Sequence, residues 1–389
     1  MTGPLRIGIA GLGIASGYTL PAFAAHPRTQ VTAAADTRPA ALQRFEAEYE
    51  GETFEDVEAL CASPNVDVVY VATPNFMHAE HATMAAEHGK HVIVEKPMAL
   101  NVEQCAAIIA AADRNRVQLV CGHTHSFNPP IRRLRELVQG GELGRVIMMH
   151  TWNYTDLLVR PRAAWELDTA RGGGVVFIQA PHQVDIVRVL GGGLVRSVRA
   201  MAGAWDEARP TEGNYTAYLE FADGTPATLV YSGYGFFDSA ELHFWVGERA
   251  QARDPETNAN SHRDLPNPAQ EEALRDARRY GGTLDRSRGA GAQHQQFFGL
   301  LLVSCQRGDL RQSPDGLFLY DARGKQEIPV PLEPSGAHAM IDELYEAVVG
   351  GEPPLHDGRW GMATVEVCEA ILESSRQRRE VVLSHQVEV

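Results

Sequence analysis

The stretch LRIGIAGLG, residues 5–13, decides the fold of this chain. It is a short β-rich run that ends in Gly11 and Gly13, and IASGYTLPAFAAH after it is typical of a helix start. Gly11 suits a tight turn and Gly13 lets the backbone approach a pyrophosphate, while Ile14 and Ala15 open a helix with free N–H groups. The sequence therefore predicts a strand, a glycine turn and a helix that bind a dinucleotide.

A second strand, VTAAAD, ends on Asp36 and supplies the acidic residue that such a site uses. We expect Asp36 to accept hydrogen bonds from the adenosine ribose hydroxyls, with Thr37 and Arg38 beside it. An arginine at this place could instead contact the 2′-phosphate of NADP, but Asp36 would repel that phosphate. We therefore predict NAD as the cofactor, with NADP as the alternative.

The strands that follow are apolar throughout and alternate with helices, which is typical of a doubly wound parallel sheet covered on both faces. VDVVYV, KHVIVE and VQLVCG are such strands, and AEHATMAAEHG and NVEQCAAIIAAADRN are the helices. Ligands of these sheets bind beyond the carboxyl ends of the strands. Residues at or near these ends are expected to contact the cofactor (Thr73, Pro74, Asn75, His78, Glu95, Lys96) or the substrate (Lys96, His125, Asn128), and His123 falls at the same strand end as His125.

Lys96 is notable because the chain carries almost no lysine. Only three of its 35 Lys and Arg residues are lysine, and Lys96 follows a strand at the end where a nicotinamide ring is expected. An arginine is locked in its charged form, whereas a lysine can take part in proton transfer. We expect Lys96 to be catalytic, with a chance surface lysine as the alternative. Glu95 is then either its partner or a plain strand-end carboxylate.

The bulk properties bound the domain count and the partners. A length of 389 residues predicts two domains, placed at 1–125 for dinucleotide binding and at 126–389 for substrate binding and oligomerisation. The net charge of −15 argues against nucleic acid or an anionic membrane, because phosphates would be repelled. Five scattered cysteines, and an N-terminal apolar run too short for a signal peptide or a membrane span, predict a cytoplasmic protein. No Cys/His cluster has zinc spacing, so no metal is expected.

The second half of the chain is dominated by consecutive strand-like segments: RVIMMHTWNYT, VRSVRAMAGAW, NYTAYLEFADG, TPATLVYSGYGFF and ELHFWVGE. A hairpin turn is expected at 222–225. Strands without intervening helices predict a large, open, mostly antiparallel sheet in an α+β domain, with one face on helices. Its other face is free to pack on a second subunit, so we expect a homo-oligomer. Residues 250–295 are polar and are expected to be an insertion with one short helix near AQEEALRDARRY.

The ordered set of GIAGLG, TPNFMH, EKP, GGGVVFIQAPHQVDIV and DGRWGMATVEVCEAILESS resembles the glucose-fructose oxidoreductase / inositol dehydrogenase / MocA (Gfo/Idh/MocA) family over nearly the full chain. The resemblance implies a two-domain NAD(P)-dependent dehydrogenase with Lys96 of EKP in the active site. In that family the glycine run is followed by an Asp, a Gly, a His and a second Asp, which carry substrate contacts and proton transfer. His182 and Asp185 match the last two positions, whereas Ile178 and Ala180 replace the first two.

The substrate class follows from this departure. Ile178 removes an acceptor for sugar hydroxyls and a negative charge, which suits a flatter, less polar or anionic substrate. Arg171 lies upstream, and an arginine fork binds a carboxylate in a bidentate way; Arg160 and Arg162 are expected to be solvated loop charges. The segment VRPR…ELDTARGGGVVF…APHQVDIVRVLGG resembles the phthalate dihydrodiol (4,5-dihydroxyphthalate) dehydrogenase branch, which implies a carboxylated cyclic dihydrodiol as substrate.

Together these inferences predict hydride transfer from a hydroxyl-bearing carbon to the nicotinamide. His182 is expected to accept the hydroxyl proton, Lys96 to bind the alkoxide or relay the proton, and Asp185 to orient the site. His125 and Asn128 are expected to contact substrate, although Asn128 is equally placed to cap the next helix. A polyol or sugar dehydrogenase, a nicotinamide-dependent glycosidase and a non-catalytic NAD-sensing protein remain as alternatives.

Overall fold

A computed structural model of the chain describes residues 3–122, 125–256, 268–283 and 293–389. His123 lies outside the described residues. The chain forms two compact units, the first made of residues 1–123, 266–289 and 337–365, and the second of 124–265, 290–336 and 366–389. The first unit thus takes in two segments from the later part of the sequence. The functional division into 1–125 and 126–389 stays a prediction.

The first unit is built on a six-stranded parallel sheet in the order β3-β2-β1-β4-β5-β6. Its strands are β1 (Leu5–Ala10), β2 (Thr29–Ala35), β3 (Glu52–Phe54), β4 (Val68–Val71), β5 (His91–Glu95) and β6 (Leu119–Gly122). The order reverses between β1 and β4, and ligands of such sheets bind outside the carboxyl ends of the strands at this point. The predicted doubly wound sheet is confirmed, and the apolar strands β4 and β5 are almost wholly buried.

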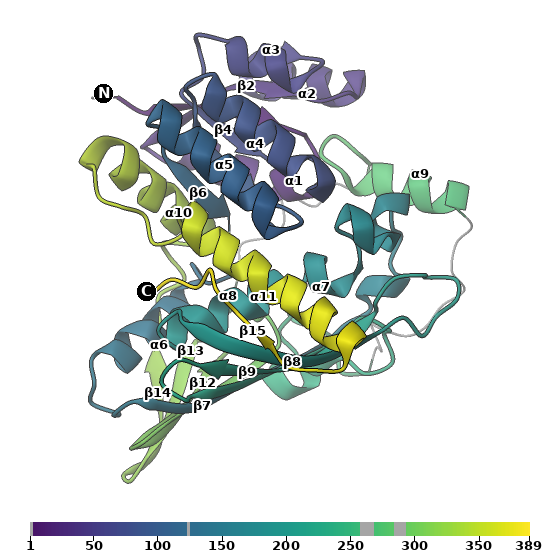
Figure 1. Ribbon diagram of the computed structural model, residues 1–389. Helices are drawn as coiled ribbons and strands as arrows, with labels where there is room; N and C mark the ends of the chain where they lie inside the picture. The colour runs from purple at the N-terminus through teal and green to yellow at the C-terminus, as the bar shows by residue number, and fades with distance from the viewer. Residues whose placement is uncertain (1–2, 123–124, 257–267, 284–292) are drawn as a thin grey trace. The chain divides into compact units, whose positions relative to one another are not determined.

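Helices link these strands, and β1 leads through the glycine turn directly into α1 (Ile14–Ala25). The others are α2 (Pro39–Tyr49), α3 (Val57–Ala62), η1 (Asn75–Met77), α4 (His78–Glu87), α5 (Val102–Asn115), α9 (Pro268–Arg278), α10 (Gly336–Tyr345) and η6 (Glu346–Gly350), while α11 (Gly358–Gln377) is shared with the second unit. In Figure 1, α4 and α5 lie side by side. Buried alanines allow this close approach, among them Ala85 and Ala111. The short helix expected in the insertion is confirmed as α9.

The second unit contains a nine-stranded sheet in the order β14-β13-β12-β11-β7-β10-β9-β8-β15 (Figure 1). Neighbouring strands are antiparallel except β7 and β10, which are parallel. The strands are β7 (Val146–Tyr154), β8 (Val195–Gly203), β9 (Asn214–Phe221), β10 (Pro226–Ser232), β11 (Leu300–Cys305), β12 (Gly308–Ser313), β13 (Gly316–Asp321), β14 (Gly324–Pro329) and β15 (Val381–Val382). The predicted open, mostly antiparallel sheet is confirmed, with the hairpin turn between β9 and β10 at Gly224, which has φ +84°.

One predicted strand is wrong. The segment ELHFWVGE forms the end of a 3-10 helix, η5 (Ser239–His243), and then a turn. Phe244 and Trp245 adopt φ of 66° and 57°, a left-handed conformation that cannot continue a strand. The Trp245 amide donates to the Ala240 carbonyl at 2.7 Å, which bends the chain back at this point. The alternating apolar residues of this segment led to the prediction of a strand, but its backbone hydrogen bonds form a turn.

Three further helices of the second unit are α6 (Pro129–Gln139), α7 (Gly174–Ile178) and α8 (Ala180–Leu190). The fully buried Gln183 fixes α8 on the sheet: its side-chain amide donates to Thr151 Oγ1 of β7 at 2.6 Å and to the Val230 carbonyl of β10 at 3.2 Å. Its carbonyl accepts from the Tyr215 hydroxyl of β9. These bonds to three strands fix the height and rotation of α8, and with them the place of His182. Among the described residues, no helix is both long enough and apolar enough to cross a bilayer.

Candidate functional site

The glycine turn after β1 fits a bound pyrophosphate. Gly11 is required by the protein itself, because it has φ +94° and a Cβ there would lie 2.9 Å from the Ala72 carbonyl. Neither backbone conformation nor lack of space requires a glycine at position 13. The φ of Gly13 is −82°, and a Cβ there would lie 3.8 Å from the Ala72 carbonyl oxygen. Gly13 also gives α1 no side-chain cap, and half-buried Ile14 and exposed Ala15 follow it. An open approach to uncapped N–H groups is what a phosphate needs.

Asp36 and Arg38 lie at the carboxyl end of β2, beside this turn. One Asp36 oxygen accepts from the Leu12 amide at 2.8 Å, and the other accepts from the Arg38 amide at 2.8 Å and from Arg38 Nε at 3.1 Å. Arg38 Nη2 donates to the Leu12 carbonyl. The carboxylate is therefore held against the glycine turn, where the ribose of a dinucleotide is expected, and Thr37 between the two is exposed.

Tyr280, just after α9, also belongs to this corner of the first unit, and no local pattern in the sequence predicts it. Its amide donates to the Gly13 carbonyl at 3.3 Å, and its carbonyl accepts from Arg38 Nη1 at 3.5 Å. Its hydroxyl donates to Glu48 Oε2 at 2.8 Å, and the Arg44 guanidinium lies 5.3 Å from its ring centre. The chain after α9 is thus anchored to the glycine turn and to α2 at once.

His78 joins two loops at the strand ends. Its Nε2 lies 2.8 Å from the Thr73 carbonyl after β4, and its Nδ1 lies 2.8 Å from the Pro97 carbonyl after β5. Burial lowers the pKa of His78, which favours the neutral ring, and a neutral ring donates to only one of these carbonyls at a time. Both nitrogens face backbone carbonyls, so this geometry supports a role in positioning the loops of Thr73 and Lys96. The predicted contact of His78 with the cofactor stays a prediction.

Lys96 is half-buried at the carboxyl end of β5, and the buried Glu95 before it fixes the backbone there. Glu95 accepts a short hydrogen bond from the Tyr70 hydroxyl of β4 and a bond from the Lys96 amide at 3.2 Å. Burial, together with the Glu95 charge, raises the pKa of Tyr70 well above its usual value, so Tyr70 stays a donor. Glu95 therefore stabilises the backbone at Lys96 by accepting a hydrogen bond from its amide. Thr73, Pro74 and Asn75 follow β4 on the neighbouring strand and are half-buried.

His182 lies in the first turn of α8, in a cluster of three rings in the second unit. The His125 and His182 rings meet edge to face with centres 4.5 Å apart, and the Phe298 ring lies 4.5 Å from His125 and 4.8 Å from His182. Gly299, with φ +76°, turns the chain so that Phe298 reaches the two histidines. Asn128 holds the N-cap position of α6 without a side-chain cap, and its amide nitrogen lies 3.3 Å from His125 Nδ1. The structure thus brings together His125, Asn128 and His182.

The other predicted substrate residues of this unit lie on the adjoining helices. Asp185 is fully buried on α8, three residues after His182. Ile178 ends α7, and Arg171 ends the 3-10 helix η4 (Thr169–Arg171), where it is exposed. Their assignment to substrate binding stays a prediction, as do the roles of Lys96, His182 and Asp185.

Arg160 and Arg162 are not solvated loop charges, as the sequence suggested. Arg160 Nε pairs with Asp156 at 2.6 Å, and Arg162 pairs with Glu166 at 3.1 Å. Burial alone would lower the pKa of Arg160, but the charges of Asp156 and Glu248 outweigh it and raise that pKa. Both arginines already have carboxylate partners within the protein.

Glu248 is the second residue that sequence reasoning missed. Its Oε1 lies 3.6 Å from His125 Nε2, beside the ring cluster. Burial alone would raise the pKa of Glu248, but the bond and charge of His125 with the charges of Arg160 and Arg249 lower it to about 2. The carboxylate is therefore ionised at neutral pH. The signal in the sequence was a carboxylate after Gly247, at the end of an apolar run that resembled a strand.

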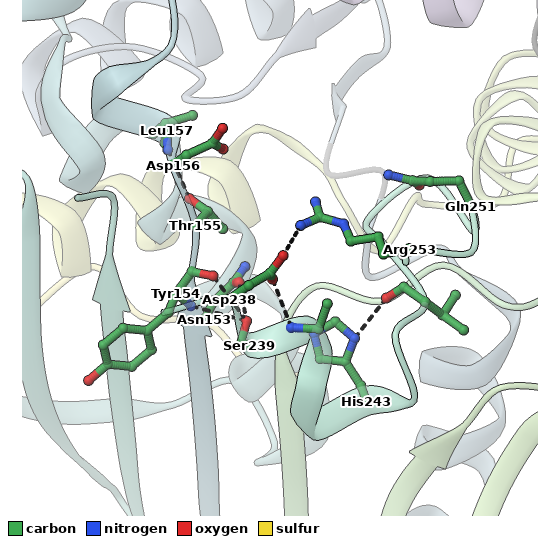
Figure 2. Close-up of polar contacts among 12 residues, drawn as sticks. Asn153, Tyr154, Thr155, Asp156, Leu157, Asp238, Ser239, His243, Gln251 and Arg253 are labelled. Carbon is green, nitrogen blue, oxygen red and sulfur yellow. Dashed lines mark hydrogen bonds and ion pairs between the residues drawn. The ribbon is translucent and has the colours of Figure 1, made fainter. Parts of the chain in front are cut away.

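The loop that carries Glu248 is anchored to the end of β7, as Figure 2 shows. Ser239 Oγ accepts from the Tyr154 amide and donates to Asn153 Oδ1, both at 3.1 Å. Asp238 pairs closely with Arg253, which lies on the far side of the Glu248 turn. Both ends of the loop are thereby tied together. Within the described ranges, no group of three or more His, Cys, Asp or Glu side chains is placed to hold a metal ion.

Comparison with known proteins agrees with this architecture. Residues 5–123 match the model of an oxidoreductase family with an NAD-binding Rossmann fold, and residues 131–247 match the GFO/IDH/MocA C-terminal domain. The fold and the glycine turn define an NAD-binding oxidoreductase. The chain belongs to the Gfo/Idh/MocA family, and it is an NAD(P)-dependent dehydrogenase.

Several relatives match over nearly the whole length. A 1-carboxy-3-chloro-3,4-dihydroxycyclo hexa-1,5-diene dehydrogenase from Comamonas testosteroni is 40% identical over 381 residues, 96% of this chain and 95% of the relative. A putative dehydrogenase from Bordetella bronchiseptica RB50 has a crystal structure with 41% identity and a TM-score of 0.90, covering 98% of this chain and all of that one. An aldose-aldose oxidoreductase from Caulobacter crescentus, 24% identical with a TM-score of 0.74 over 98% of this chain and 100% of its own, shares the fold.

Proposed function

We propose that this dehydrogenase oxidises a cyclic dihydrodiol that carries a carboxylate, and that it uses NAD. The observation that carries the proposal is the full-length similarity to the Comamonas testosteroni enzyme, whose name gives a carboxylated dihydroxycyclohexadiene. Oxidation of one hydroxyl of such a ring gives an enone that tautomerises to a catechol. The gain of aromaticity then favours the oxidation.

The chemistry of the chain's own residues follows from their protonation. NAD, when bound, accepts the hydride. A neutral His182 accepts the hydroxyl proton, and Lys96 donates a hydrogen bond to the developing alkoxide or relays the proton. Asp185, fully buried on the same helix as His182, orients the site. The joint action of Lys96 and His182 on one substrate is part of the proposal.

The polarity of the second unit supports a flat, anionic substrate. Ile178 stands where the family resemblance expects a carboxylate, so one acceptor for sugar hydroxyls is missing. The rings of His125, His182 and Phe298 pack into one aromatic cluster with centres less than 5 Å apart. Arg171, exposed just before α7, is the arginine that we assign to the substrate carboxylate.

Steady-state oxidation assays test the substrate class. Purified protein is given NAD with carboxylated dihydrodiols, the same dihydrodiols without the carboxylate, polyols and sugars, and reduced nicotinamide is followed by absorbance. We expect turnover of the carboxylated dihydrodiol, and Arg171→Gln should raise its KM about tenfold with little change in kcat. Arg196→Gln, an exposed arginine on β8, is the matched control. Turnover of polyols alone would refute the assignment of Ile178 and Arg171.

The other functions considered are less well supported. A sugar or polyol dehydrogenase would keep the same catalytic residues, and the substrate panel separates it directly. A glycosidase would release sugar without net formation of NADH, and an NAD sensor would show no turnover to lose. Similarity to a dehydrogenase over 96% of the chain favours net oxidation over both.

Preference for NAD over NADP is supported by the partners of Arg38. Its Nε, Nη1 and Nη2 donate to Asp36, the Tyr280 carbonyl and the Leu12 carbonyl. An arginine held in this way would have to give up internal bonds to reach a 2′-phosphate. Asp36 would also repel that phosphate. Titration of both cofactors by calorimetry is the direct test, and tighter binding of NADP would contradict the proposal.

We also propose a homo-oligomer that packs through the exposed face of the large sheet. Trp152 of β7 is 45% exposed, and the strand register aligns it with Val230, Thr216 and Met201 of the neighbouring strands. Trp152 and Met201 are large apolar side chains at the two ends of this row, and their exposure favours contact between two sheet faces. Light scattering should show that Trp152→Glu shifts the protein toward monomer, whereas Leu332→Glu, an exposed loop residue, should not. A monomeric wild type would refute this point.

Location in the cytoplasm is a further part of the proposal. All five cysteines are free thiols with buried side chains, which suits a reducing compartment.

A further inference from the structure

The turn that carries Glu248 is closed by its own backbone. The Gly247 amide donates to the Gln251 carbonyl at 2.8 Å, and the Ala250 amide donates back to the Gly247 carbonyl at 2.9 Å. Val246 and Ala252 form an isolated antiparallel bridge. Glu248 therefore stands within a tightly bonded turn, so its backbone position is set before its side chain meets any partner.

Two side-chain contacts stabilise the two ends of this turn. The buried His243 ring approaches the Val246 carbonyl through Nδ1 at 2.8 Å, and burial lowers its pKa to about 4, so the ring is neutral at physiological pH. The close pair of Asp238 and Arg253 spans the turn, and Figure 2 shows both contacts. The Arg253 amide donates to the Trp245 carbonyl at 2.7 Å. These contacts fix the backbone of the turn and thereby the direction in which the Glu248 carboxylate points.

Glu248 is aimed at one nitrogen of His125. The side-chain nitrogen of Asn128 can only donate, so at 3.3 Å from His125 Nδ1 it needs an unprotonated Nδ1 as its acceptor. The neutral His125 ring then carries its proton on Nε2, and Nε2 is the atom that lies 3.6 Å from Glu248 Oε1. Asn128 and Glu248 thus select the same tautomer from opposite sides of the ring.

His125 passes this orientation on to His182. Their ring planes meet at 83° with centres 4.5 Å apart, and Phe298 touches both rings. A change in the tilt of His125 would therefore change the packing that holds the His182 ring. The Glu248 carboxylate lies beside His125, the ring that contacts His182, so its negative charge favours a positive charge on this ring cluster.

We propose that Glu248 is a positioning residue of the dehydrogenase reaction: its carboxylate fixes His125 in one tautomer and orientation, and His125 with Phe298 orients the His182 imidazole that accepts the substrate proton. This inference rests on the proposed role of His182. Glu248 neither takes nor gives the proton, because its carboxylate stays ionised. The negative charge of Glu248 lowers the free energy of the imidazolium form of His182. Its contact with His125 fixes the orientation of the His125 ring.

The charged groups around Glu248 define the expected pH effect. They are His125, Arg160, Arg249 and the hydroxyl of buried Tyr231. Loss of the carboxylate charge leaves the arginines uncompensated and makes a nearby imidazolium less favourable. The pKa of His182 should then fall, and the acid limb of the kcat profile should move to lower pH.

The test compares Glu248→Gln with Glu241→Gln, an exposed carboxylate in the same loop. Glu248→Gln should lower kcat at neutral pH about tenfold and shift the acid limb down by about one pH unit, with NAD affinity and melting temperature unchanged. Glu241→Gln should match the wild type. An unshifted acid limb, or a fall in kcat explained by a lower melting temperature, would overturn the proposal.

A second variant protects the test from misfolding of the turn. His125→Phe keeps a ring against His182 and Phe298 but cannot pair with Glu248. It should reproduce the fall in kcat that comes from lost ring orientation, whereas its acid limb should stay close to that of the wild type because the Glu248 charge remains. Adding Glu248→Gln to it should move the acid limb but lower kcat by less than about twofold further, because both residues orient His182 through one contact. Independent, additive losses would overturn the proposal.

Histidine NMR separates this inference from the choice of substrate. Nitrogen shifts of the NAD-bound protein report the tautomer of each ring without any substrate. The wild type should hold His125 as the Nε2–H tautomer, and Glu248→Gln should lose that preference. Unchanged shifts would overturn the role of Glu248. If the wild type shows the expected nitrogen shifts but oxidises no substrate, the proposed function is rejected. The contact between His125 and Glu248 would then stand without a role in catalysis.

Discussion

Arg38 donates to Asp36 through Nε across 3.1 Å, and the same carboxylate accepts from the Leu12 amide of the glycine turn at 2.8 Å. The carboxylate that we expect to bind the ribose therefore also supports the glycine turn that we expect to hold the pyrophosphate. A change at Asp36 acts on both the charge and the shape of the cofactor site.

Asp36→Ser should shift selectivity toward NADP. We expect kcat/KM for NAD to fall about tenfold and that for NADP to rise, because the repulsion of the 2′-phosphate is lost and Arg38 is released to bind it. Glu55→Gln, an exposed carboxylate just beyond β3, removes the same charge as a control and should leave the ratio unchanged. An unchanged ratio in Asp36→Ser would show that selectivity lies elsewhere.

Tyr280 should matter for cofactor affinity. Tyr280→Ala removes the hydroxyl bond to Glu48 and the ring contact with Arg44, so the segment after α9 loses its side-chain contacts with α2 and only the backbone bond to the Gly13 carbonyl still holds it at the glycine turn. We expect NAD to bind several-fold more weakly and to dissociate faster, as measured by calorimetry and stopped-flow fluorescence. Tyr280→Phe keeps the ring and should lie between the two. Wild-type affinity in Tyr280→Ala would mean that the segment has no part in cofactor binding.

Lys96→Met should cost turnover and spare NAD binding. Loss of a cation that stabilises an alkoxide costs about 3 kcal/mol, so kcat should fall about a hundredfold or more. Lys325→Met removes an exposed lysine on β14 and is the matched control. Lys96→Arg keeps the charge but holds its proton, so it distinguishes charge stabilisation from proton relay. Near wild-type turnover in Lys96→Met would refute a catalytic role for this residue.

The nucleotide-binding half of the site was accessible from the sequence because its signals are local. Buried parallel strands are written as continuous apolar runs, so β4 and β5 and the residues after them could be placed without a structure. Asp36 follows from the strand before it, and Gly11 from a turn that allows no side chain.

The parts of the site and fold that the sequence did not predict depend on contacts between segments far apart in the chain. Tyr280 reaches Arg38 across 242 positions, and no local pattern reports such a contact. Glu248 was hidden for another reason: FWVGE alternates like a strand, but positive φ at Phe244 and Trp245 makes it a turn. Strands β11 to β14 were not predicted, and for β14 the reason is that its polar sequence GKQEIP lacks the alternation that marks a buried face.

Glu366 ties the end of the chain to α11, and this contact gives a stability prediction. One oxygen accepts from the amides of Ser384 at 2.7 Å and His385 at 3.1 Å, and the other accepts from Gln386 Nε2 at 2.7 Å. Gln386 in turn accepts from the buried Arg188 of α8 at 3.1 Å. Glu366→Gln should weaken these charge-assisted bonds and lower the free energy of unfolding at pH 7 by about 2 kcal/mol.

The pH dependence identifies the cause. Burial alone would raise the pKa of Glu366, but the bonds from Gln386, Ser384 and His385 lower it below its usual value of 4.5. A carboxylate whose pKa is lowered by folding stabilises the protein above about pH 4.5, and this stabilisation is lost as the pH falls through the folded-state pKa. Thermal unfolding should therefore show the full difference between wild type and Glu366→Gln at pH 7 and a shrinking one below pH 4.5. Glu373→Gln on the same helix should show no such trend, and a difference independent of pH would point to lost packing.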